Sequence, residues 1–184
     1  FPVLSRGKVF QVMAACEMGS PSWWSFSDEL ETRELWWDIK PGDVVADVGA
    51  DFGSYTLSAL AQGAAMVYAW SPPHRVATQL EGETIFRSAM LNGWGDRLVV
   101  SADGLWSEAG WLAAFDGPRE PRLFGSPVAA RAAIDGQPGN CAAFIVSTLD
   151  ASDLPRLDWL KIDSEGAELH VLRGARETIE RCHP

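Results

Sequence analysis

Short apolar runs alternate with longer segments of helical periodicity along most of this chain, a pattern typical of strands and helices in turn. The apolar runs predict strands over residues 43–48, 65–70, 97–101, 143–148 and 157–162, preceded by an entry strand over residues 7–15. The segments that separate or follow them predict helices over residues 25–37, 53–62, 75–91 and 167–179. Strands that alternate with helices predict an α/β fold with a mostly parallel sheet and helices on both of its faces.

The apolar period disappears between residues 107 and 140, where glycine, proline, alanine and arginine dominate. We expect an irregular insertion there, with room for a hairpin, in a chain of 184 residues that folds as a single domain. Residues 1–40 are expected to form a lead-in of a strand and a helix. Arg119, Arg122 and Arg131 in the insertion suit either a lid over a binding site or an ordinary surface loop. The chain ends where such a sheet would take another strand, so the sequence leaves open whether C-terminal strands are missing.

Charge and composition narrow the class of partner. Hydrophobic residues make up 47% of the chain and charged residues 22%, as in an ordinary globular protein. The formal net charge is −10 and no run of lysine and arginine relieves it, so we expect neither nucleic acid nor a membrane as partner. No apolar stretch approaches the ~20 residues that span a bilayer, and the chain does not open on a secretory signal. Cys16, Cys141 and Cys182 lie far apart, so we expect reduced thiols, no metal site and a cytoplasmic location.

The first candidate for chemistry is a glycine turn at the end of a predicted strand. It reads Asp47-Val48-Gly49-Ala50-Asp51-Phe52-Gly53, and in an open parallel sheet ligands bind outside the carboxyl ends of the strands. The turn is not the G-x-G-x-x-G fingerprint, in which a helix N-terminus holds a pyrophosphate. Asp47 and Asp51 would repel a pyrophosphate and attract an ammonium, which suits the amino-acid and ribose portions of S-adenosylmethionine. A tight turn whose glycines serve packing alone is the other interpretation.

The second candidate is the segment Leu160-Lys161-Ile162-Asp163-Ser164-Glu165-Gly166-Ala167-Glu168, in which a strand ends in polar residues. We expect it to face the same crevice as the glycine turn. Lys161, Asp163 and Glu165 alternate, so a strand that continued through Glu165 would turn all three to one side. In the other interpretation these residues cap the last helix through its free N–H groups. Glu168, inside that helix, is expected to form an ion pair or to contact the preceding turn.

These motifs resemble those of the FkbM family of S-adenosylmethionine-dependent methyltransferases, over roughly residues 31–184. The D-V-G-A-N-x-G turn of the family reads here as residues 47–53, followed by Ser54-Tyr55-Thr56, and its Y-A-F-E-P strand end reads Tyr68-Ala69-Trp70-Ser71-Pro72. Its N-x-x-x-N pattern reads Ser88 to Asn92. The late block is nearly intact, as Thr148-Leu149-Asp150, Lys161 to Glu168, and Leu172-Arg173-Gly174-Ala175.

The resemblance implies a Rossmann-like methyltransferase fold, S-adenosylmethionine as cofactor, and O-methylation of a hydroxyl on a small molecule or sugar. Methyl transfer needs an oriented acceptor and a base at the rim of the crevice. We therefore expect Asp163 first and Glu165 second to take the proton, with Lys161 orienting or electrostatically tuning them. The implied cofactor-binding residues are Asp47, Gly49, Ala50, Asp51, Gly53, Tyr55, Thr56 and Ser71.

Three positions depart from the family pattern. Asp51 replaces an asparagine, and Ser88 replaces the first of the paired asparagines. Ser71 stands where an acid normally grips both ribose hydroxyls. A hydrogen bond to a charged group contributes about 1.5–3 kcal/mol, so its loss would lower cofactor affinity by about one to two orders of magnitude. Asp51 or Asp103 could supply a carboxylate from a neighbouring strand end.

Other functions are consistent with parts of the sequence. Ser71 and the open end of the sheet also fit a non-catalytic or decayed S-adenosylmethionine-binding module on the same fold. A nicotinamide-dependent oxidoreductase is disfavoured, because the third glycine of its fingerprint and the acid after the second strand are both absent. Trp36 and Trp37 would either wall an acceptor site or, as is more common, fill the core.

Overall fold

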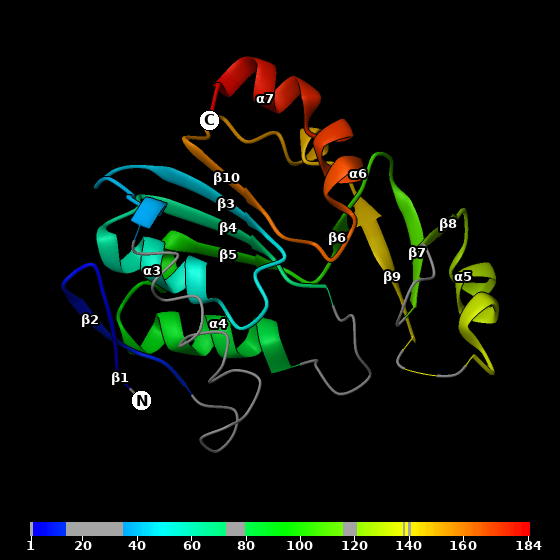
Figure 1. Ribbon diagram of the computed structural model, residues 1–184, viewed down its shortest axis with the longest axis horizontal. Helices are drawn as coiled ribbons and strands as arrows, with labels where there is room; N and C mark the ends of the chain where they lie inside the picture. Colours follow the sequence, from blue (N-terminus) through cyan, green and yellow to red (C-terminus); the bar gives the residue numbers. More distant parts are fainter. Residues whose placement is uncertain (1, 14–34, 73–79, 116–120, 138, 140) are drawn as a thin grey trace.

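A parallel sheet of four strands forms the centre of the molecule in the computed structural model, which describes residues 2–13, 35–72, 80–115, 121–137, 139 and 141–184 (Figure 1). Both faces of the sheet are covered, which is why most residues of its strands are apolar. The sheet predicted from the alternation of strands and helices is therefore confirmed. Its strands lie in the order β10 (Trp159–Ile162), β3 (Val44–Val48), β4 (Met66–Trp70) and β5 (Leu98–Ser101).

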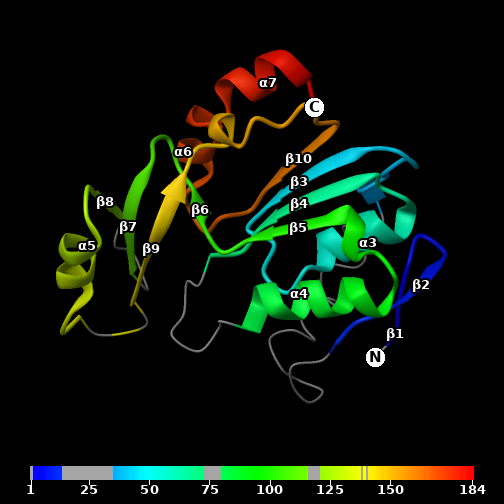
Figure 2. The ribbon, with the colours of Figure 1, turned by 180° about the vertical axis from the view of Figure 1, so that it is seen from behind.

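Helices cover both faces of this sheet (Figures 1 and 2). On one face α3 (Ser54–Gln62) and α4 (Leu80–Leu91) pack on alternate residues of β3 and β4. On the other face α6 (Glu168–Arg173) and α7 (Arg176–Cys182) pack on the strand residues of opposite parity. Within the described ranges, no helix is both long enough and apolar enough to cross a membrane. The first cluster includes Val45, Leu57, Leu60, Val67 and Ile85, and the second includes Ala46, Val48, Val171 and Ala175.

The described part of the insertion is more regular than its sequence indicated. A second sheet follows the order β6 (Gly104–Leu105), β9 (Cys141–Ser147), β7 (Gly110–Phe115) and β8 (Arg122–Phe124). The expected hairpin is the antiparallel pair β7–β8, and α5 (Pro127–Ile134) packs on β7 and β9. The strand predicted over residues 143–148 joins this second sheet as β9, and not the parallel sheet. The reason is apolar packing, since Leu112, Phe144 and Val146 complete the cluster beneath α6.

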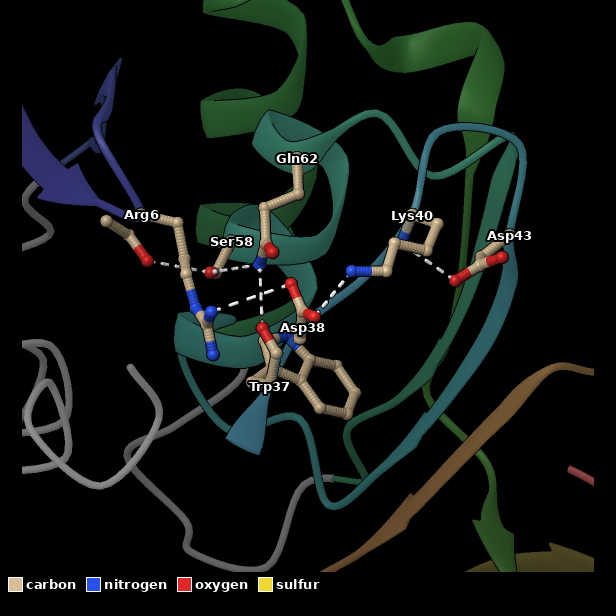
Figure 3. Close-up of polar contacts among 8 residues, drawn as sticks. Arg6, Trp37, Asp38, Lys40, Asp43, Ser58 and Gln62 are labelled. Carbon is tan, nitrogen blue, oxygen red and sulfur yellow. Dashed lines mark hydrogen bonds and ion pairs between the residues drawn. The ribbon is translucent and has the colours of Figure 1, made fainter. Parts of the chain in front are cut away.

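The lead-in is a hairpin (Figures 1 and 2), and polar contacts tie it to α3. Strands β1 (Pro2–Ser5) and β2 (Lys8–Gln11) pair with each other, so the predicted entry strand is one arm of a hairpin and lies outside the parallel sheet. The Ser5 and Ser58 hydroxyls lie 2.9 Å apart. The Gln62 side chain donates to the Trp37 carbonyl at 3.1 Å, as Figure 3 shows. The helix predicted over residues 25–37 falls mostly outside the described residues, as do Arg119 and the first residues of the helix predicted over 75–91.

The end of α4 anchors β2 through the two positions of the N-x-x-x-N pattern. The Asn92 side chain accepts from the Gln11 N–H at 2.9 Å and donates to the Gln11 carbonyl at 2.7 Å, as a neighbouring strand would. The Ser88 hydroxyl accepts from the Met13 N–H at 3.0 Å and is fully buried. This motif therefore holds the lead-in against α4, and serine keeps the acceptor that the position requires.

The last predicted helix is two helices, and the residues between them explain the break. A Cβ on Gly174 would lie 2.0 Å from the Trp106 carbonyl oxygen, so glycine lets this backbone approach the segment after β6. The carboxylate of Asp150 accepts from the N–H groups of Glu177 and Thr178 at 3.2 and 2.8 Å, which caps the start of α7. The T-L-D and L-x-G-A motifs thus serve to position α6 and α7.

Candidate functional site

The carboxyl ends of the four parallel strands lie along one edge of the sheet (Figure 1). Residues 49–53 follow β3, Ser71 follows β4, Asp103 lies just beyond β5, and residues 163–166 follow β10. The two predicted motifs therefore meet at one edge, as the strand order requires. The second sheet begins beside this edge, because β6 follows β5 closely in the chain (Figure 1).

Gly49 is held by two neighbouring strands. Its N–H and that of Ala50 both donate to the Trp70 carbonyl at the end of β4, at 3.0 and 2.9 Å. Its φ is +76°, and an added Cβ would lie 1.7 Å from the Asp163 carbonyl oxygen beyond β10. A side chain at position 49 would displace the turn or the loop after β10. Glycine therefore allows the two predicted motifs to touch through their backbones.

Gly53 ends the turn where α3 begins. Its φ is +89°, and an added Cβ would lie 2.8 Å from Cγ1 of Ile85 on α4. Between the two glycines, Asp51 has a φ of +49°, a left-handed conformation that aspartate and asparagine adopt more readily than other side chains. The aspartate that replaces the family asparagine therefore suits the backbone of this turn.

Asp47 and Lys161 form a buried ion pair beneath the turn. The Lys161 Nζ lies 3.0 Å from Asp47 Oδ1, and the side chains are 8% and 0% exposed. The other carboxylate oxygen of Asp47 accepts a hydrogen bond of 2.7 Å from the Thr56 hydroxyl. Lys161 also donates to the Gly49 carbonyl at 2.7 Å, and its Nζ lies 5.1 Å from the centre of the Tyr55 ring. Asp47 was expected to attract the ammonium of a cofactor, but its burial and its ion pair keep that carboxylate inside the protein.

Ser71 supports the turn from the end of β4. Its hydroxyl donates to the Asp51 carbonyl at 3.3 Å, and the residue is 7% exposed. A buried hydroxyl that already donates to the turn offers a ribose fewer hydrogen bonds than the carboxylate that the FkbM pattern has at this position. Asp51 and Asp103 are half-buried at the neighbouring strand ends, and the Asp103 N–H donates to the Ser101 hydroxyl at 3.1 Å. Both therefore lie where a carboxylate could replace the acid that is missing at Ser71.

Asp163 and Glu165 are exposed after β10, whereas Lys161 is buried within it. The strand ends at Ile162 and Glu165 has a φ of +53°, so the alternation does not extend to Glu165 and the three side chains do not share one side. The Asp163 N–H donates to the Val48 carbonyl at 3.0 Å, which keeps its backbone beside the glycine turn. Burial thus separates Lys161 from the two carboxylates that it was expected to orient.

Glu168 closes the loop after β10, as the expected contact with the preceding turn required. Its Oε1 accepts from the N–H groups of Ser164 at 2.9 Å and Gly166 at 3.2 Å. Burial acts to raise the pKa of Glu168, but hydrogen bonds from its own N–H, Ser164 and Gly166 outweigh burial and hold the pKa below its usual value. Glu168 therefore shapes the loop, and Asp163 and Glu165 remain the exposed carboxylates of the motif.

The tryptophans ahead of the turn divide between core and surface. Trp37 is fully buried, donates its indole N–H to the Tyr55 carbonyl at 3.2 Å, and meets the Tyr55 ring edge-on at 5.3 Å. Trp36 is 44% exposed and its ring centre lies 5.8 Å from that of Tyr55. Trp37 thus fills the core, and it fixes the start of α3 on which Tyr55 and Thr56 stand.

One cluster near the site was not predicted. The rings of Trp106 and His170 stack at 3.7 Å with their planes 9° apart, and the Ser107 hydroxyl lies 3.4 Å from His170 Nδ1. These contacts join α6 to the segment after β6. Ser107 and His170 are 63 residues apart, a separation at which no local pattern carries a signal. Among the described residues, no three His, Cys, Asp or Glu side chains are grouped so as to hold a metal ion.

Comparison with known proteins places this arrangement in a family. A family model described as "Methyltransferase FkbM domain" matches residues 47–184. The structure is similar to the crystal structure of methyltransferase FkbM from Methylobacillus flagellatus KT, with a TM-score of 0.57 and 18% sequence identity. That match covers 85% of this chain but only 35% of the other, and it supports the α/β fold with its parallel sheet between helices. A crystal structure of PRMT6-SAH matches 47% of this chain and 23% of its own length, at 24% identity and a TM-score of 0.33. No curated protein matches the sequence.

Proposed function

Because this chain belongs to the methyltransferase FkbM family, as the match over residues 47–184 shows, we propose that it methylates a hydroxyl of a small molecule or sugar with S-adenosylmethionine as donor. Family membership supports methyl transfer in general. The donor, the oxygen acceptor and the acceptor class are the proposal. A net charge of −10 supports a small acceptor over nucleic acid.

One observation carries the proposal, namely the contact between Gly49 and the backbone of Asp163. The Asp163 carbonyl oxygen occupies the space of a Cβ on Gly49, only 1.7 Å from where that atom would be. The glycine turn and an exposed carboxylate are therefore immediate neighbours. A donor bound on the turn would have a proton acceptor beside it.

The residues of the turn fit the proposed donor better than a phosphate-containing one. Gly49 and Gly53 allow the tight turn because neighbouring residues leave no room for a side chain at either position, and the half-buried Asp51 offers a carboxylate to an ammonium. The residues from 49 to 53 include no lysine or arginine that could pair with a pyrophosphate. When bound, S-adenosylmethionine supplies a methyl group whose carbon bonds to the acceptor oxygen as its bond to sulfur breaks.

The work of the protein in this proposal is to orient the acceptor and to take its proton. Asp163 receives the hydroxyl proton as the new carbon–oxygen bond forms, so a methyl ether leaves and the proton stays on the carboxylate. Glu165, exposed in the same loop, is the second candidate for this role. A positioned general base typically contributes about 10²–10⁴ in rate.

Calorimetric titration of S-adenosylhomocysteine into the chain tests the cofactor assignment. We expect micromolar binding, and the absence of heat at millimolar ligand would overturn that assignment. An acceptor screen with S-adenosylmethionine then compares Asp163→Asn with Glu165→Gln. We expect Asp163→Asn to lose about 10²–10⁴ in turnover while S-adenosylhomocysteine affinity stays within twofold. A loss confined to Glu165→Gln would transfer the proton-accepting role to Glu165.

A second function, a decayed or non-catalytic binding module, is favoured by Ser71. Its buried hydroxyl is engaged with the Asp51 carbonyl, in place of the family acid. Ser71→Glu separates the two functions, with Ser71→Ala as the control for loss of that hydrogen bond. A gain of tenfold or more in S-adenosylhomocysteine affinity would indicate a decayed natural site. Unchanged affinity would indicate that Asp51 or Asp103 already binds the ribose.

A further inference from the structure

We infer that Lys161 is a positioning residue for the glycine turn. It holds this turn through the Gly49 carbonyl, from inside the sheet. This role rests on the proposed function, because it concerns the turn that would bind the donor. It differs from the role predicted from the sequence, in which Lys161 orients or tunes Asp163 and Glu165.

The contacts of Lys161 are the first step in the argument. Its Nζ donates to the Gly49 carbonyl at 2.7 Å, lies 3.0 Å from Asp47 Oδ1, and sits 5.1 Å from the centre of the Tyr55 ring. All three partners belong to β3, to the turn after it, or to α3, which begins where that turn ends. Asp163 and Glu165 are exposed, whereas the Lys161 side chain is only 8% exposed. Lys161 is therefore directed at the turn.

The Gly49 peptide shows why such a donor matters. Its N–H is held by the Trp70 carbonyl at 3.0 Å, and its Cα is packed against the Asp163 carbonyl. The remaining polar group is its own carbonyl, which accepts from Lys161. A left-handed glycine can rotate its peptide with little steric resistance, so a strong bond to that carbonyl sets the direction of the Ala50 N–H. That N–H completes the turn by donating to Trp70 at 2.9 Å.

Burial and charge make a lysine suitable for this task. An ammonium has several donors, so Lys161 reaches the Asp47 carboxylate and the Gly49 carbonyl at the same time. Asp47 neutralises the buried charge and is itself held by the Thr56 hydroxyl at 2.7 Å. The Lys161–Asp47 pair thus ties β10 to β3, and Thr56 extends the link to the start of α3. The glycine turn lies next to this pair, because Lys161 also donates to Gly49.

Two double variants separate positioning from simple stabilisation. Lys161→Met alone would leave a buried carboxylate without its ion partner, so both variants carry Asp47→Asn, which keeps an acceptor for Thr56. Lys161→Met removes the donor to Gly49, and Lys161→Gln, of similar size, retains one. Arg176→Met, which removes an exposed cation paired with Glu180 on α7, is the control for loss of a positive charge. Thermal unfolding establishes that every variant is folded before binding is measured.

Calorimetry with S-adenosylhomocysteine and amide hydrogen exchange over residues 49–53 are the two measurements. We expect the Met double variant to bind about 10- to 100-fold more weakly and to exchange faster in this segment, because a charged hydrogen bond is lost. The Gln double variant should recover several-fold of that affinity, and Arg176→Met should match the unmodified chain. Equal affinity and exchange in the two double variants would overturn the inference, since a purely structural ion pair makes them equivalent.

The same measurements distinguish this inference from the proposed function. If the unmodified chain binds no S-adenosylhomocysteine, the proposed function fails, and exchange in residues 49–53 still tests whether Lys161 holds the turn. If Lys161 instead tunes the carboxylates, the Met double variant keeps its affinity and its exchange rate. Only the pH dependence of turnover would then change, and the inference would be wrong.

Discussion

At the scale of single residues, Gly49 matters because the space beside it is already occupied. Backbone from β10 lies where its side chain would be, and its φ of +76° disfavours any other residue. Asp51 and Glu165, also in left-handed conformations, show that the two loops facing each other are both tightly turned. These local conformations bring the backbone of the glycine turn against the loop that carries the exposed carboxylates Asp163 and Glu165.

Gly49→Ala should therefore destabilise the protein by about 2–5 kcal/mol, from backbone strain and from overlap with the Asp163 carbonyl. Gly42→Ala is the matched control, because Gly42 has a φ of +95° but nothing within 4 Å of an added Cβ. We expect the control to lose only about 1 kcal/mol, from strain alone. Urea unfolding measures both. Equal losses would mean that the loop after β10 moves aside at little cost.

The Glu168 carboxylate predicts a pH dependence. Its pKa is lower in the folded protein than in the unfolded chain, so its stabilising contribution is present above about pH 4.3 and is lost as pH falls through the folded value. Glu168→Gln should be less stable than the unmodified chain at pH 6, by less than about 1 kcal/mol because the group is partly solvated. The difference should shrink as pH falls from 5 to 3. Urea titrations at each pH test this, and a constant difference would exclude the linkage.

At the scale of elements, the T-L-D and L-x-G-A motifs act at the ends of α6 and α7. The break at Gly174 brings α6 against the segment after β6, and Asp150 starts α7 as a separate helix. The stack of Trp106 on His170 then lies at the join between the parallel sheet and the second sheet. The ends of α6 and α7 thus fix how these two helices pack on the core.

Asp150→Ala should lower stability by about 1–2 kcal/mol, because two N–H groups at the start of α7 lose their acceptor. Amide exchange should rise over residues 176–182 and change little in β3. Glu180→Gln removes an exposed carboxylate from the same helix and should cost no more than about 0.5 kcal/mol. A matching loss in both variants would show that Asp150 acts through general charge and not as a cap.

At the scale of the whole molecule, the edge of the parallel sheet meets the second sheet. Leu112 and Phe144 from the second sheet share an apolar cluster with Val48 and Trp70 beneath the turn and the end of β4. The candidate site is therefore supported from below by a core common to both sheets. A ligand at this edge should stabilise the whole fold.

S-adenosylhomocysteine at 100 times its Kd should stabilise the chain by about 2.7 kcal/mol, which raises Tm by about 5–10 °C for a protein of this size. A nicotinamide dinucleotide at the same concentration is the control, because its pyrophosphate has no cationic partner in the turn. Scanning calorimetry or a dye-based melt gives both values. A shift with the dinucleotide alone would favour the oxidoreductase alternative.

The sequence by itself determined the parallel strands, the glycine turn and the acid-bearing end of β10. Each of these depends on neighbours within a few residues, such as an apolar run that ends in glycine and aspartate. Tertiary structure decided which residues those motifs contact. Lys161 pairs with Asp47 and with Gly49, 112 residues away, and the hydroxyl of Ser71 is engaged with the turn. Tertiary structure likewise placed β9 in the second sheet and divided the last helix, because burial across distant segments overrides a local period.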